Sequence, residues 1–526
     1  MTNVEGLREQ LRQRGYLSHG IERWFALDPW SSRTFWAELA TVAAKAALLM
    51  AVFAALPCVA IMIVRNHPVS AVETLEMFVI YAAAWFVIAF ALVVAVALLM
   101  KIRPELPIDT SRGLLIVSIV ASALLIVPLA LWWFEFDVPA SRPELLAGGA
   151  LAVILFVVSS IVVSAALLSF TIYELKRIPA IHQKPRTIPL GAGAAVLIAL
   201  LLVPAYAAPE RHEGPPLQVV TTPMQRHVAL IAVDGLSDAI LRSRPDLAGE
   251  FQSAAAVPRI AGTSTTERWA SVGTGVPASL HGVHALEGVQ LAGGAHILQS
   301  VSRADVVLRH AGKRLPLPPT IRRRDFVWEI FAGRGVPSLA VNWWTAPDLR
   351  SGALTSVGQE SIFSAAHGDA LAVDSGAIRR FLQGIDEGHP RFATVYLPAL
   401  DVILNRAAGD PAARLAMSIR ALDGVLALVR ELRHRGYDVL LAGMPGESQS
   451  GRAVVAATLP IDKQPDSAFD IAPLLCDLAG FPASKEMPGH SVTSRIASYG
   501  NRIRSEERPK LNDEYYQSLR SLGYIR

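Results

Sequence analysis

The chain has 526 residues, of which 52% are hydrophobic, and its mean hydropathy of +0.37 exceeds what a soluble globular protein needs. The formal net charge is only +4, and Lys and Arg gather beside apolar runs, which suits anionic lipid headgroups and argues against nucleic acid as a partner. Cys58 lies in an apolar run and Cys476 in a predicted helix, so neither a disulfide nor a cysteine-based metal site is expected.

Apolar runs of near-membrane length predict five transmembrane helices. Basic residues gather before the first run and in every second connection after it, which by the positive-inside rule places the N-terminus in the cytoplasm. An odd number of spans then places everything after Tyr206 outside the cytoplasm. In a bacterium this means an inner-membrane protein with a periplasmic domain. The predicted spans are 46–64, 78–100, 114–134, 146–171 and 189–206.

The membrane half is interpreted as an anchor or lipid-contacting platform. No charged residue lies deep inside the last four predicted spans, which argues against a transporter with a proton or ion path. The predicted domains are a cytoplasmic segment at 1–45, a five-span domain at 46–206, a linker at 207–226 and an extracytoplasmic domain at 227–526.

From His227 onward, strand-like and helix-like segments alternate. This alternation predicts an α/β domain with a mostly parallel central sheet and helices on both faces. The predicted strands are 227–233, 337–343, 391–397, 437–442 and 452–458. The predicted helices are 237–252, one starting at Thr266, 325–334, 374–386, 410–435 and 468–480.

Polar residues follow several of these strands. Ligands of such sheets collect at the carboxyl ends of the strands, so the residues there are expected to share one rim. The residues concerned are Asp234, the run 342–344, Asp401 and the turn 443–447. A carboxylate at a strand end, facing a hydroxyl cluster that opens a helix, is the geometry of a metal-assisted nucleophile and points to phosphate or sulfate ester chemistry.

Four short motifs occur in a fixed order: Val-Asp-Gly at 233–235, a hydroxyl-rich segment at 263–269, Thr-Gly at 274–275 and His-Gly at 281–282. Their order and spacing resemble the alkaline-phosphatase superfamily, in the branch of type I phosphodiesterases, nucleotide pyrophosphatases and sulfatases. The resemblance covers most of 227–526 and implies an alkaline phosphatase-like fold. It makes Thr265 the candidate nucleophile and Asp234 and Asp401 candidate metal ligands.

Active members need two divalent metals, such as Zn or Mn, about 4 Å apart. Here four of the six ligands that the resemblance implies are missing. Asn405, Met444 and Pro445 stand at three of those positions, and the loop 447–450 offers no histidine for the fourth, although Glu447 could supply an oxygen. The sequence therefore gives no firm cofactor prediction.

The favoured function is a metal-deficient pseudo-hydrolase anchored in the inner membrane, whose rim binds an anionic envelope lipid, a glycan or a protein partner. Candidate binding residues are Asn342, Arg268 and Asn405. The alternative is an active phosphodiesterase, sulfatase or headgroup transferase that uses Thr265 with one or two divalent metals.

Each candidate also has a purely structural interpretation. Asp234 suits a turn or a helix cap, and Thr265 lies in a Ser/Thr cluster that could simply cap a helix. Arg268 and the run 322–324 are expected to be solvated charge, and the pair 343–344 to be core rather than a ligand platform.

Overall fold

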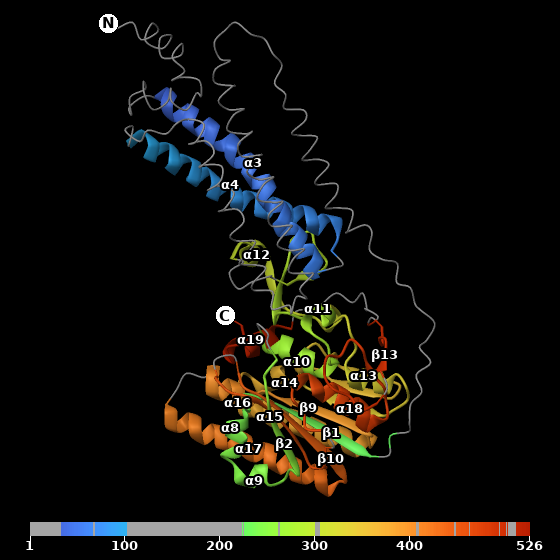
Figure 1. Cartoon of the computed structure of the whole chain (residues 1–526). Coiled ribbons are helices and arrows are strands. Elements are labelled where there is room, and N and C mark those ends of the chain that lie inside the picture. Colours follow the sequence, from blue (N-terminus) through green and yellow to red (C-terminus); the bar gives the residue numbers. More distant parts are fainter. Residues whose placement is uncertain are drawn as a thin grey trace, which may run out of the picture. The chain divides into compact units, whose positions relative to one another are not determined.

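The computed structural model divides into two compact units (Figure 1). Unit 1 comprises residues 1–210 and 289–313, and unit 2 comprises 211–288 and 314–526. The structure describes residues 33–66, 69–102, 224, 226–260, 264–299, 306–406, 410–446, 449–461, 463–493, 495–500, 502 and 512–525.

Two long helices that follow each other closely in the sequence form the described start of unit 1 (Figure 1). They are α3 (Arg33–Asn66) and α4 (Ala71–Ile102), and they contain the first two predicted spans. Within α4, Ala71–Ala91 is long and apolar enough to cross a membrane, and it is the one stretch among the described residues that meets this criterion. The other three predicted spans and nearly all of the predicted linker lie outside the described residues.

A segment from the C-terminal half of the chain belongs to unit 1 and binds the end of α3 and the start of α4. Asn66 exchanges two hydrogen bonds with the backbone of Gln299: its Nδ2 donates to the carbonyl over 3.0 Å, and its Oδ1 accepts the N–H over 2.6 Å. Glu73, which is fully buried, accepts the N–H of His296 over 2.8 Å. Beneath these bonds lies a hydrophobic cluster that includes Cys58, Val59, Met62, Val289, Leu291, Leu298 and Leu308.

An eight-stranded sheet forms the centre of unit 2, in the order β2-β11-β10-β1-β9-β6-β8-β7. Strands β10, β1, β9, β6 and β8 are parallel to one another, and β11 and β7 run against their neighbours. The prediction of a mostly parallel sheet is thereby confirmed. The strands are β1 (His227–Asp234), β2 (Ser253–Val257), β6 (Ser338–Val341), β7 (Leu349–Ser351), β8 (Leu354–Val357), β9 (Phe392–Leu397), β10 (Tyr437–Met444) and β11 (Ala453–Ala457).

Most predicted helices of unit 2 are present with shifted ends. The single helix expected at 237–252 is wrong: α8 (Asp238–Arg242) ends before Pro245, which has no N–H and starts a separate short helix, α9 (Pro245–Ala248). The other helices at predicted places are α10 (Thr265–Thr274), α13 (Val327–Ala332), α15 (Ala370–Gly388), α17 (Pro411–His434) and α18 (Ile471–Ala479). Not predicted were α14 (Gln359–Ala366), α19 (Asp513–Ser521) and the strands β2, β7 and β8.

Aromatic side chains fill the core beside β6 and β9. Trp343 and Trp344 are buried there, and the ring of Trp343 lies 4.6 Å from that of Trp328. The expectation of solvated charge at Arg322 is wrong, because this side chain is fully buried and makes two hydrogen bonds of 2.6 and 2.7 Å to the carboxylate of Glu329. A bidentate pair of this kind allows an arginine to enter the core without an uncompensated charge.

Candidate functional site

The ends of three adjacent strands meet at one edge of the sheet. Asp234 closes β1 and pairs in register with Met444 at the end of β10, while Asp401 follows β9 in the short helix α16 (Ala399–Asp401). Gly235 allows the β1 turn to approach closely: its φ is +86°, and a Cβ there would lie 2.5 Å from the backbone nitrogen of Asp401. The Val-Asp-Gly motif thus brings Asp234 and Asp401 to the same rim.

Asp234 is completely buried at this rim. The phenol of Tyr396 donates a 2.9 Å hydrogen bond to its Oδ2, whereas Oδ1 is buried without a hydrogen-bond partner of standard geometry within the described residues. Burial first, and then the neighbouring carboxylate of Asp401, raise the pKa of Asp234 above its usual range, and the guanidinium of Arg268 opposes that rise. The two aspartates are therefore close enough to repel each other.

Asp401 is in contact with a neutral amide. Asn405 lies four residues further on, in the π-helical turn η2 (Val402–Arg406), and its Nδ2 donates a 2.7 Å hydrogen bond to Oδ1 of Asp401. The turn after β10 packs directly on this pair, since a Cβ added at Gly446 would overlap both Oδ1 of Asp401 and Nδ2 of Asn405. The backbone at Gly446 thus covers the carboxylate.

Thr265 is the first residue of α10, but it does not cap that helix. The cap is Ser264, whose hydroxyl accepts the N–H of Glu267 over 3.1 Å. The hydroxyl of Thr265 instead accepts a 3.3 Å hydrogen bond from Nη2 of Arg268, and Nη1 of the same guanidinium donates to the carbonyl of Pro445 over 3.2 Å. Arg268 is 2% exposed, so the expectation of a solvated charge there is wrong.

Asn342 follows β6 at the same edge and has a left-handed backbone with φ of +66°. Its Nδ2 donates to the carbonyl of Tyr396 over 2.8 Å, and its own carbonyl accepts from Nε2 of Gln359. The side chain is fully buried. The structure therefore places Asn342 between β6 and β9, where its amide holds the two strand ends together.

The residues at the rim do not fit a two-metal centre. Met444, at one expected ligand position, is 1% exposed and belongs to the hydrophobic core. At a second position Pro445 offers only a carbonyl, which accepts from Arg268, and at a third Asn405 donates its amide to Asp401. Glu447 lies outside the described residues. The donors brought together are two carboxylates and one hydroxyl, fewer than a pair of dications requires.

His281 belongs to the structural support of α10. The N–H of Val283 donates to its Nδ1 over 3.1 Å, so Nε2 carries the proton and donates to the hydroxyl of Ser271 over 2.9 Å. Burial, followed by the charges of Arg322 and Arg323, lowers the pKa of His281 to about 3. The imidazole is neutral, and both of its nitrogens have partners.

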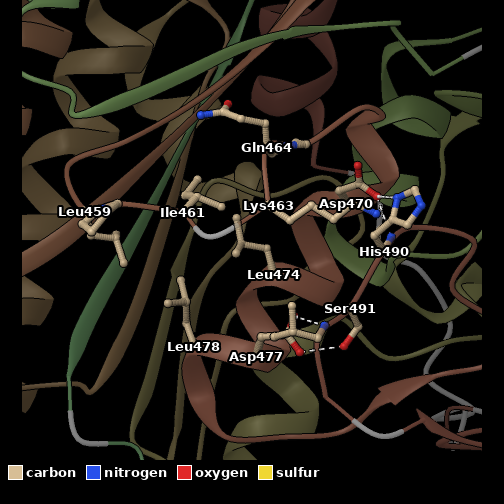
Figure 2. A pocket seen from close by; sticks show the side chains of 13 residues that line it. Leu459, Ile461, Lys463, Gln464, Asp470, Leu474, Asp477, Leu478, His490 and Ser491 are labelled. Atoms are coloured by element: carbon tan, nitrogen blue, oxygen red, sulfur yellow. Dashed lines mark hydrogen bonds and ion pairs between the residues drawn. The ribbon is translucent and has the colours of Figure 1, made fainter.

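A separate pocket of about 200 Å³ lies beside α18 (Figure 2). Its lining includes Leu459, Ile461, Lys463, Leu474, Leu478 and Val492, and none of the six candidate site residues belongs to it.

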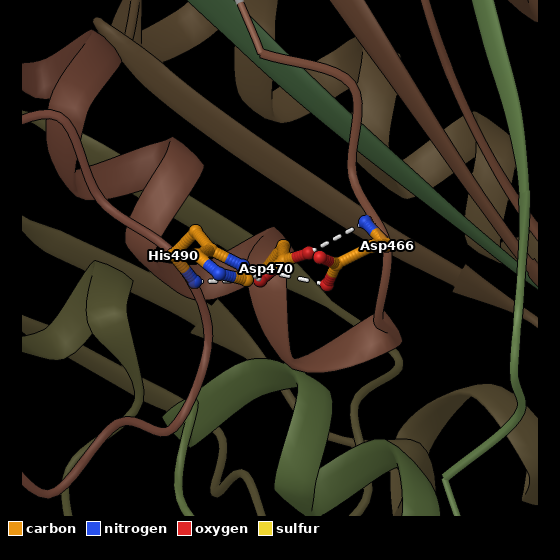
Figure 3. A group of neighbouring side chains, drawn as sticks. All are labelled: Asp466, Asp470 and His490. Carbon is orange, nitrogen blue, oxygen red and sulfur yellow. Dashed lines mark hydrogen bonds and ion pairs between the residues drawn. The ribbon is translucent and has the colours of Figure 1, made fainter.

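Asp466, Asp470 and His490 gather near this pocket at a spacing that would suit a cation (Figure 3). The carboxylate of Asp470 already accepts the N–H groups of Asp466, Ser467 and His490 at 2.6 to 2.9 Å. The bonds from Asp466 and Ser467 form the turn that leads into α18, and the bond from His490 ties a later segment to that turn, which gives the cluster a structural role.

No protein-family model and no curated protein matches this chain. Among solved structures, the chain is similar to phosphonoacetate hydrolase from Sinorhizobium meliloti 1021, with 16% identity, 44% of this chain and 60% of that chain covered, and a TM-score of 0.29. Human ectonucleotide pyrophosphatase/phosphodiesterase 5 gives 15% identity, 41% and 56% coverage, and a TM-score of 0.30.

The integral membrane lipooligosaccharide phosphoethanolamine transferase A from Neisseria meningitidis is similar over 86% of this chain and 96% of that chain, with 11% identity and a TM-score of 0.32. The chain thus spans less than two thirds of the first two proteins and nearly all of the third. These similarities are too low for the fold or the function to be inferred from them.

Proposed function

We propose that residues 227–526 form an alkaline phosphatase-like domain that has lost its metals and serves as a membrane-anchored binding module. The observation that carries this proposal is the replacement of ligands at the rim: a core methionine, a prolyl carbonyl and an amide occupy places where a two-metal centre needs carboxylates and imidazoles. Without such a centre, no pair of metal ions ionises the threonine hydroxyl and stabilises the leaving oxygen of an ester.

The ligand class is an anionic envelope component, with lipid as the first candidate and a glycan or protein as the others. The apolar stretch Ala71–Ala91 supports a membrane location. The inner-membrane position, the five spans and the periplasmic side of the C-terminal domain belong to this proposal and rest on the distribution of basic residues in the sequence.

Metal analysis of the full-length protein in detergent, combined with turnover of p-nitrophenyl phosphate, phosphodiester and sulfate esters, tests the proposal. We expect substoichiometric zinc and manganese and no turnover above that of the Thr265→Ala variant. Thr266→Ala is the matched control, because it removes a neighbouring buried hydroxyl. Stoichiometric metal with turnover that only Thr265→Ala abolishes would refute the pseudo-hydrolase.

One observation favours the alternative, a hydrolase or headgroup transferase with a single metal. Oδ1 of Asp234 is buried and has no hydrogen-bond partner of standard geometry in the described part of the chain, and such an atom suits a cation. A single manganese bound through Asp234 and Asp401, with activity, is the result that would establish this second function.

A further inference from the structure

We propose that the guanidinium of Arg268 is the resident cation of the rim and takes the place of a metal ion between Thr265 and the end of β10. This inference deepens the proposed function and rests on it. It explains how two neighbouring buried aspartates remain in a folded domain, and it assigns the exclusion of divalent metals to one residue of this chain.

The position of the guanidinium carries the inference. Nη2 donates to the hydroxyl of Thr265, the oxygen that the sequence resemblance gives to the nucleophile, and Nη1 donates to the carbonyl of Pro445. The guanidinium therefore bridges the start of α10 and the residue that follows β10, and the sequence resemblance gives these places to the nucleophile and to a metal ligand. Because the side chain is 2% exposed, this position is not shared with bulk water.

The charges around Arg268 give independent support. Asp234 and Asp401 are 0% and 1% exposed, and burial of like charges at such proximity is unfavourable unless a cation is near. Arg268 supplies a cation at this rim, because its Nη1 donates to the carbonyl of Pro445, the residue that follows the register partner of Asp234. A divalent ion in the same space would be repelled by the guanidinium, since charges interact strongly where water is excluded.

Arg322 shows what a purely structural buried arginine looks like in this fold. It binds the carboxylate of Glu329 through two short hydrogen bonds, so its charge has a direct partner, and it also donates to the carbonyl of Arg324. The two hydrogen bonds of Arg268 given above go instead to a hydroxyl and a backbone carbonyl, which are the kinds of oxygen that a hard metal ion also accepts as ligands. Of these two buried arginines, Arg268 is the one that lies at the rim.

The test compares Mn²⁺ binding by the full-length wild-type protein and the Arg268→Met variant in detergent, followed by the loss of the free Mn²⁺ electron paramagnetic resonance signal. Methionine keeps much of the length and removes the charge. We expect the variant to gain one saturable Mn²⁺ site, at least roughly tenfold tighter than any wild-type binding, and the double variant Arg268→Met with Asp401→Asn to lose it again.

Two outcomes overturn the inference in different ways. If folded Arg268→Met binds Mn²⁺ no better than the wild type, this inference fails and the pseudo-hydrolase proposal survives. If the wild type already binds stoichiometric Mn²⁺ or Zn²⁺, both fail. Arg322→Met serves as the control, because it removes a buried arginine away from the rim and gains no site.

Should Arg268→Met be too unstable for the metal titration, its melting temperature decides the question. The double variant with Asp401→Asn removes one charge of each sign, so its melting temperature should lie above that of Arg268→Met alone. Simple additivity of the two single changes would overturn the inference, because it would show that the two charges do not interact.

Discussion

Nδ1 of His296 lies 2.9 Å from Oε2 of Glu73, although 223 positions separate the two residues in the chain. The contact joins the first turn of α4 to a segment of the C-terminal half. Glu73 also accepts the backbone N–H of His296, and Glu76, one turn later, accepts the backbone N–H of Gly293 over 2.8 Å. The segment around Gly293 and His296 is thus held to the helix pair mainly through its backbone.

Replacing Glu73 should release this segment. Glu73→Ala removes the carboxylate acceptor of the N–H groups of Ser70 and His296, and a hydrogen bond of this kind contributes about 0.5–1.5 kcal/mol. Hydrogen exchange measured by mass spectrometry should become faster across residues 291–299. Glu73→Gln retains one acceptor oxygen and should show a smaller effect. Unchanged exchange in Glu73→Ala would show that the hydrophobic cluster alone holds the segment.

The stability of the C-terminal domain should fall as the pH rises toward neutrality. Burial, opposed by the N–H of Ala399 and assisted by Asp234, raises the pKa of Asp374 to about 8, compared with about 3.9 in an unfolded chain. The folded state then holds the extra proton between these values, so each pH unit within this window removes up to about 1.4 kcal/mol, and the loss ends above the folded pKa. Melting temperatures between pH of about 5 and about 8 measure this slope. Asp374→Asn should flatten it, and a slope unchanged in that variant would exclude Asp374 as its source.

Removing the hydroxyl of Tyr396 should have a cost that depends on pH. Its hydrogen bond goes to the carboxylate of Asp234, and bonds to a charged acceptor contribute about 1.5–3 kcal/mol against about 1 kcal/mol for a neutral one. Tyr396→Phe should therefore destabilise more at alkaline than at acidic pH, where Asp234 is protonated. Tyr437→Phe is the matched control, because that hydroxyl donates to the neutral carbonyl of Pro390 over 2.7 Å. Equal pH profiles for the two variants would contradict the expectation.

Gly446→Ala should disturb the rim directly. The new methyl group would overlap Oδ1 of Asp401 and Nδ2 of Asn405, and forced overlaps of this kind cost about 1–3 kcal/mol or more. Gly388→Ala provides the comparison: a Cβ there meets nothing within 4 Å, and its position at the end of α15 favours alanine by up to about 1 kcal/mol. Thermal melts of the two variants should therefore move in opposite directions. A neutral Gly446→Ala would show that the turn after β10 moves aside easily.

Much of the central sheet could be predicted from the sequence, because its parallel strands are continuous apolar runs followed by polar residues. The segment Phe392–Leu397 is fully buried, and its mostly apolar sequence indicates a buried strand. The strand Ser253–Val257 was missed because it consists mainly of alanine, which favours no strand. The break before Pro245 could be predicted, because proline has no N–H and is unfavourable inside a helix.

The position of the rim could be predicted from the sequence, but the burial and the contacts of its side chains could not. The motif order placed Asp234 and Thr265 correctly at a strand end and a helix start. The burial of Arg268 and the approach of Gly446 to Asp401 depend on how α10 and the turn after β10 pack, for which a single sequence gives no pattern. Tyr396 did carry a signal, because a tyrosine inside a buried strand needs a partner for its hydroxyl.

The contacts of Asn66 and Glu73 with residues 296–299 also restrict how the chain is threaded through a bilayer. Groups that share hydrogen bonds with the end of α3 and the start of α4 must face the same aqueous compartment. If α4 crosses the membrane away from that compartment, the chain has to return before residue 289, so the number of crossings after Ile102 must be odd. The predicted spans at 114–134, 146–171 and 189–206 satisfy this parity, and cysteine labelling from each side of sealed vesicles at positions 68 and 105 should find them on opposite sides.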